Sequence, residues 1–262
     1  SSPDLILNYL WRTAGSMTVV GILGPFLIGT GPILAVSSLV LSRSSLLILL
    51  GLVGAFYWIT ILIAISILLR GFTSTDPGNL ASLSLLLTAV VLQGAARLLQ
   101  AKGFRLGLGR LNAYAAGQHS TLTKQDAWGV ILALGTGQAA AQSLAFFVSW
   151  LPFLRNGGTL TPPSSCWNIS FFVQAALNSL GFSLVLPAAA LLSCTAALQD
   201  GGMLSMAGFP AGLHLAAAFL TVLGSTNSAV CVLGTPAMLC LGLASVGLAS
   251  SSFWRAEDLS RL

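Results

Sequence analysis

The chain has 262 residues, of which 55% are hydrophobic and only 6% charged, and its mean hydropathy is +0.90. A soluble domain carries roughly a quarter charged residues, so this composition excludes a water-soluble globular protein. The net charge of +5 comes from basic residues scattered over several segments without a binding motif, which argues against a nucleic-acid partner. The sequence predicts an all-α fold, namely a polytopic seven-transmembrane-helix bundle surrounded by membrane lipid.

Seven apolar runs follow one another along the chain. Each is long enough to cross about 30 Å of hydrocarbon as a helix, the sixth only just. We expect an N-terminal extension (1–16), a seven-helix membrane domain (17–251) and a C-terminal tail (252–262), with loops between the runs. The runs cover residues 18–41, 46–69, 80–99, 127–153, 169–198, 207–223 and 228–249.

Basic residues favour one side of the predicted bundle. The loops and tail on that side, with Arg97, hold eight Lys or Arg, against three on the other side. Because positive charge accumulates on the cytosolic side, the N-terminus is predicted to be lumenal and the C-terminus cytosolic. Asn168 opens a candidate glycosylation sequon on the lumenal side, although its place almost against the membrane disfavours modification.

Two polar residues end the third run, where Gln93 and Arg97 lie one turn apart. A long cationic side chain near the end of a membrane helix commonly snorkels to the interface. This is the account of Arg97 that the sequence favours.

Small residues recur at four-residue spacing on two neighbouring stripes of the fourth run. Such stripes let helices approach closely in lipid, and Gln138 and Gln142, one turn apart, could bond to another helix. The stripes serve either internal packing or the docking of a partner's helix. In the second case Gly135→Leu should weaken recovery of that partner. The stripes are Gly135, Ala139 and Ser143, and Ala133, Gly137 and Ala141.

His214 is the ionisable side chain set deepest in an apolar run. A neutral imidazole inside a bundle needs partners for both ring nitrogens, so a hydrogen-bonded structural role is expected. The alternative is a proton-handling histidine, which the lack of a carboxylate to relay to disfavours. Pro187, in the fifth run, should kink or loosen its helix, either opening a cavity or accommodating a neighbour.

No Asp or Glu lies within an apolar run. The usual groups for proton relay, ion coupling or aspartyl proteolysis are therefore missing, and we predict no catalytic, cofactor or metal site. The alternative from another class is a small-molecule membrane transporter or channel, in which broken helices around Pro187 and Pro210 would line a substrate path beside His214.

Short motifs in the same order resemble the anterior pharynx-defective (Aph) family of γ-secretase subunits, from Met17 to near Ser251. The closest is Gly54-Ala55-Phe56-Tyr57-Trp58, and Gly31-Pro32, Leu92-Gln93 with Arg97, and Lys124-Gln125 are similar to other family motifs. The chain departs from the family pattern at several positions. Gly94 replaces an acidic residue, Leu186 replaces a membrane histidine, and Ile131 replaces the first glycine of a triad.

The resemblance implies a non-catalytic scaffold of the γ-secretase complex in the endoplasmic reticulum, Golgi and plasma membrane. It implies assembly with a presenilin-like aspartyl protease, a nicastrin-like glycoprotein and the presenilin enhancer subunit. The residues expected to serve structure or partner binding are His214, Gly135, Ala139, Gln138, Gln142, Gln93, Arg97, Gly54 and Trp58.

Overall fold

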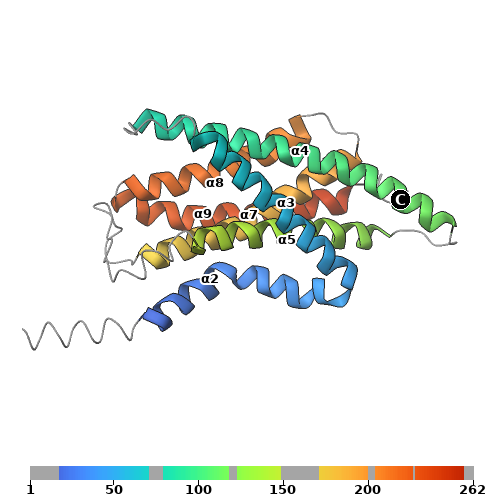
Figure 1. Cartoon of the computed structure of the whole chain (residues 1–262), viewed down its shortest axis with the longest axis horizontal. Helices are drawn as coiled ribbons and strands as arrows, with labels where there is room; N and C mark the ends of the chain where they lie inside the picture. Colours follow the sequence, from blue (N-terminus) through green and yellow to red (C-terminus); the bar gives the residue numbers. More distant parts are fainter. Residues whose placement is uncertain are drawn as a thin grey trace, which may run out of the picture.

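A computed structural model describes residues 18–70, 79–117, 123–148, 171–199, 204–226 and 228–256. Within these ranges the chain forms seven α-helices and no strand (Figure 1). A 3-10 turn, η1 (Leu41–Arg43), joins α2 (Thr18–Leu39) to α3 (Ser45–Arg70), and a π-helical turn, η2 (Leu204–Gly208), precedes α8 (Phe209–Thr226). Asn168 and the expected N-terminal extension lie outside the described residues. The helices are α2 (Thr18–Leu39), α3 (Ser45–Arg70), α4 (Asn79–Gly117), α5 (Lys124–Val148), α7 (Phe171–Leu198), α8 (Phe209–Thr226) and α9 (Ser228–Arg255).

Five of these helices are long and apolar enough to cross a membrane, and the apolar part of α8, Phe209–Val222, is shorter. The predicted all-helical, polytopic membrane architecture is confirmed. The five candidate spans are Leu23–Arg43, Ser45–Leu68, Lys124–Phe146, Val173–Leu198 and Leu233–Arg255.

The prediction of a loop after residue 99 is wrong, because α4 continues as a helix to Gly117. Its 39 residues give a length of about 58 Å, well beyond the thickness of the hydrocarbon. Ala101, Phe104 and Leu108 are buried in one core cluster with residues of α5, α7 and α9, and α4 packs directly against α7. Tertiary burial of this apolar face explains why the helix continues where the hydropathy falls.

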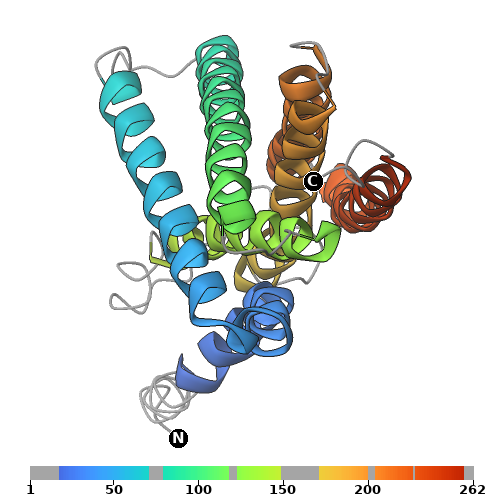
Figure 2. The same ribbon diagram turned by 90° about the vertical axis from the view of Figure 1, so that its right-hand side faces the viewer.

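Helix α7 lies at the centre of the bundle and packs against α2, α4, α5, α8 and α9. It runs through Pro187 without interruption. A Cβ atom at Gly135 of α5 would lie 2.8 Å from the Cα atom of Pro187, so the proline fits against a position without a side chain. Helices α2 and α4 lie on opposite sides of the bundle (Figure 1, Figure 2).

Helices α3 and α5 approach until their backbones touch. A Cβ atom at Gly137 would overlap the carbonyl oxygen of Gly51, and one at Gly54 would overlap the carbonyl oxygen of Leu134. Close backbone approach at small residues supplies much of the packing energy between helices in lipid, where apolar burial gives little driving force. Gly51, Gly54 and Gly137 therefore set the spacing of this helix pair.

The contact between α3 and α5 predicts a strong effect of Gly137→Ala. The new methyl group would have to displace backbone, and overpacking of this kind costs about 1–3 kcal/mol. We expect a clear fall in the melting temperature of the purified chain in mild detergent. Gly247→Ala in α9 is the matched control, since nothing outside the adjoining turns of its own helix lies within 4 Å of the added Cβ. Equal melting temperatures for the two variants would contradict the contact.

Candidate functional site

Arg97 of α4 and His214 of α8 meet inside the bundle. Arg97 is 1% exposed and His214 4% exposed, and Nη2 of Arg97 lies 2.8 Å from Nδ1 of His214. Since a guanidinium group can only donate, Nδ1 accepts the hydrogen bond and the ring proton of a neutral imidazole is on Nε2. The prediction that Arg97 snorkels to the interface is wrong, because the side chain turns inward to this acceptor.

The indole ring of Trp58, from α3, lies against the guanidinium group. The Cζ atom of Arg97 is 5.1 Å from the ring centroid, and Trp58 is fully buried. Desolvated contacts of this kind stabilise a cation by about 2 kcal/mol. The rings of Trp58 and Phe182 also approach the imidazole of His214, with centroid distances of 6.2 Å and 5.6 Å.

Glutamines of α5 complete this polar cluster. Nε1 of Trp58 donates to Oε1 of Gln142 at 2.8 Å, and Nε2 of Gln138 donates to Oε1 of Gln100 on α4. Gln142 and Gln138 thus bond to other helices of the chain, namely α3 and α4. We define the polar cluster as Arg97, His214, Trp58, Gln142, Gln138 and Gln100, contributed by α3, α4, α5 and α8.

A polar face on α4 contributes two residues, Arg97 and Gln100, to the polar cluster. Gln93, Arg97 and Gln100 are spaced by four and three residues, so they share one side of the helix, and Gln93 is 7% exposed. The hydroxyl group of Tyr57 donates to the carbonyl oxygen of Ala96 at 2.6 Å and ties α3 to the same helix. Sequence reasoning missed Gln100 and Tyr57, although the spacing of the three polar residues on α4 was a usable signal.

The two small-residue stripes of α5 face other helices of the same chain. Gly135 lies against Pro187 and Ala190 of α7, and the hydroxyl groups of Ser143 and Ser179 are 3.0 Å apart. The second stripe faces α3 through Gly137. Ala139 is fully buried. Both stripes therefore serve internal packing, the first of the two predicted alternatives.

The charge of Arg97 is compensated without a carboxylate among the described residues. Asp126 is the one acidic residue of that part, and it bonds to Thr123 at the start of α5. Nε and Nη1 of Arg97 have no hydrogen-bond partner within the same ranges. The imidazole of His214 and the face of Trp58 are thus the groups that stabilise the buried cation.

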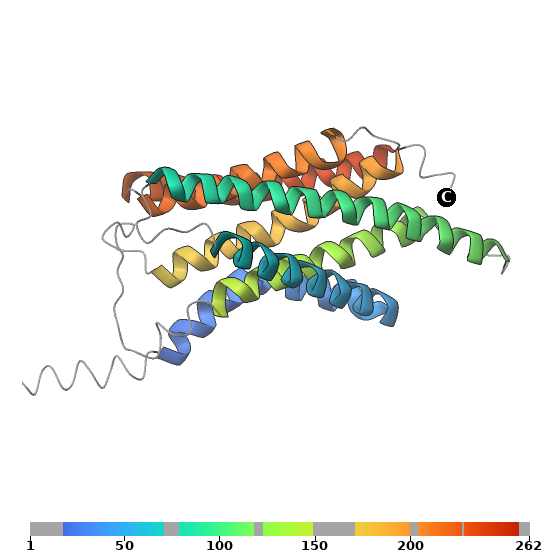
Figure 3. The ribbon, with the colours of Figure 1, turned by 45° about the horizontal axis from the view of Figure 1, so that its top comes forward.

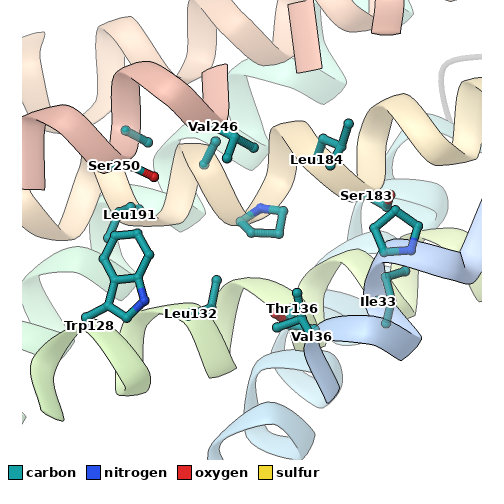
Figure 4. A pocket seen from close by; sticks show the side chains of 14 residues that line it. Ile33, Val36, Trp128, Leu132, Thr136, Ser183, Leu184, Leu191, Val246 and Ser250 are labelled. Atoms are coloured by element: carbon teal, nitrogen blue, oxygen red, sulfur yellow. The ribbon is translucent and has the colours of Figure 1, made fainter. Parts of the chain in front are cut away.

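A separate cavity of about 140 Å³ lies between α2, α5, α7 and α9. Figure 4 shows its lining of mostly apolar side chains, with Trp128 towards one end and Thr136 and Ile33 towards the other. No residue of the polar cluster lines it. The polar cluster and the apolar cavity are therefore distinct features of the bundle.

Close-packed apolar helices around one buried polar cluster define a polytopic helical membrane protein. Residues 20–256 match the family model described as Aph-1 protein. Because the match covers nearly the whole chain, the protein belongs to the Aph-1 family. This membership supports a role as a subunit of γ-secretase. A comparison with curated proteins finds no match.

The Arg97–His214 contact predicts that substitutions of the two residues have strongly non-additive effects on the free energy of unfolding, as a double-mutant cycle would measure. His214→Leu would leave the buried guanidinium without its acceptor, and losing a hydrogen bond to a charged group costs about 1.5–3 kcal/mol. Arg97→Leu together with His214→Leu should restore part of the lost stability, since no unpaired charge remains. Unfolding in mild detergent gives the free energies of unfolding of the purified wild type, the two single variants and the double variant. Additive effects of the two substitutions would contradict the contact.

Proposed function

We propose that this chain is a non-catalytic scaffold of γ-secretase that stabilises the complex and so supports intramembrane proteolysis of type I membrane proteins. The observation that carries the proposal is the enclosed contact between Arg97 and His214, in a chain whose residues 20–256 match the Aph-1 family. A buried polar contact of this kind fixes how α4 and α8 pack. It holds the bundle in one arrangement against which other subunits can assemble.

In this proposal α4 and α8 cross the membrane together with the five candidate spans, which gives seven spans. The N-terminus is lumenal and the C-terminus cytosolic, as the distribution of basic residues favours. The complex resides in the endoplasmic reticulum, Golgi and plasma membrane. The partners are a presenilin-like aspartyl protease, a nicastrin-like glycoprotein and the presenilin enhancer subunit.

The outer faces of the helices suit this role. On α3, Leu52, Phe56 and Ile67 are 63%, 74% and 68% exposed, so they can contact either lipid or the helices of a partner. The same helix fixes its inner face through Gly54 and Trp58. A helix whose inner face is held by close packing and whose outer face is apolar offers a defined surface to a neighbouring subunit.

The sequence supports a complex in which a partner subunit carries the catalytic residues. All six Asp and Glu residues lie outside the apolar runs, whereas an intramembrane aspartyl protease needs acidic residues within the membrane. We therefore assign the catalytic carboxylates to the presenilin-like subunit. This chain stabilises that subunit and holds it in position within the complex.

Removal of the chain from cells should leave the presenilin-like partner unstable and unprocessed. Wild-type chain should restore its maturation, and His214→Leu should restore it several-fold less well, because the interior contact is lost. Immunoblots of the processed partner, with co-purification in mild detergent, measure both effects. Gly247→Ala serves as the control and should behave as wild type. Normal maturation of the partner in cells without the chain would reject the scaffold role.

A further inference from the structure

The part of α4 beyond residue 98 has two different faces. Ala101, Phe104 and Leu108 are buried against the bundle. On the opposite side Leu99, Lys102, Leu106 and Arg110 follow one another at spacings of three, four and four residues, which places them on one stripe. All four are exposed. We call these four residues the basic stripe.

The buried face fixes where the basic stripe points. Because Ala101, Phe104 and Leu108 pack into the core, this part of α4 cannot rotate without exposing them to solvent. Figure 3 shows the C-terminal turns of α4 projecting beyond the ends of the other helices. The stripe is thus held in a defined direction at one end of the bundle.

The position of Lys102 along the helix matches the edge of a bilayer. Lys102 lies 23 residues after Asn79, the first residue of α4, and this separation corresponds to about 35 Å. The hydrocarbon is about 30 Å thick, and the headgroups extend it to about 40–45 Å. If α4 enters the membrane near Asn79, Lys102 therefore reaches the opposite headgroup layer, with Arg110 about 12 Å further out.

Positive charge dominates the surroundings of the basic stripe. Residues 79–117 contain no Asp or Glu, and Arg105 is exposed beside the stripe. Lys124 of α5 is engaged elsewhere, since its Nζ atom donates to the carbonyl oxygens of Trp254 and Ala256. Asp126 is held by Thr123. Within the described ranges, no carboxylate is left beside Lys102 and Arg110 to balance them.

We propose that the basic stripe binds the headgroups of anionic phospholipids at this end of the bundle. Lys102 and Arg110 supply the charge that anionic headgroups attract. Leu99 is 68% exposed and lies about 4.5 Å before Lys102 along the helix, on the side of the hydrocarbon, so acyl chains next to the headgroups can cover it. A water-soluble acidic partner would match the charges but would leave this exposed leucine unexplained. The apolar side chain directly inside the first cation therefore favours lipid.

Lipid selectivity of the full chain tests this proposal. The purified chain is reconstituted into phosphatidylcholine vesicles that contain spin-labelled phosphatidylserine or spin-labelled phosphatidylcholine. The immobilised fraction of each label then gives the relative association constant. We expect wild type to prefer phosphatidylserine at least about five-fold, which is the effect of one basic side chain near a membrane surface. High salt should reduce this preference by screening.

Substitutions separate the basic stripe from the general charge of the protein. Lys102→Gln and Arg110→Gln should each lower the preference, by up to about five-fold, and together should nearly abolish it. The control is Arg43→Gln, which removes the same charge from an exposed position in η1. Equal immobilisation of both labels by wild type, or an equal loss in the control variant, would overturn the proposal. Circular dichroism verifies that the variants keep their helices.

Discussion

The contact between α3 and α5 is the constraint on which the rest of the bundle depends. Gly51 and Gly54 on α3 and Gly137 on α5 bring the two backbones together. One turn after Gly54, this approach places Trp58 where its indole nitrogen can reach Gln142. The same ring then forms the surface on which the guanidinium group of Arg97 lies. Backbone spacing, set by residues without side chains, thus determines where a buried cation can be tolerated.

The polar cluster fixes how α4 packs against α8, as the glycines fix how α3 packs against α5. An isolated guanidinium group inside a bundle is costly, and removing its acceptor leaves that cost uncompensated. The hydrogen bond from Arg97 to His214 therefore links the position of α4 to that of α8. Tyr57 reinforces the link by bonding to the backbone of α4 next to Arg97. The contact therefore favours an arrangement in which α4 and α8 lie side by side.

Local patterns in the sequence predicted most of the helices and the small-residue stripes of α5, because hydropathy and four-residue spacing are local properties. Hydropathy predicted only the first part of α4, since it detects the apolar run and this helix continues beyond residue 99 on the burial of Phe104 and Leu108. The pairing of Arg97 with His214 could not be predicted, because the two residues are 117 positions apart. Their contact exists only when α4 and α8 pack together. Gln138 and Gln142 were identified as donors or acceptors, but their partners depended on the same tertiary arrangement.

Two departures from the pattern that the chain resembles explain why the cluster has this form. Leu186, at the place of the other membrane histidine of that pattern, is fully buried among apolar side chains that include Phe182, so it offers His214 no polar partner. Gly94 replaces an acidic residue, and a Cβ atom there would lie only 3.3 Å from that of Ala211 on α8. The missing side chain lets α4 approach α8 closely, which brings Arg97 within reach of the imidazole. A cluster that pairs a buried cation with a neutral imidazole acceptor is suited to joining α4 and α8.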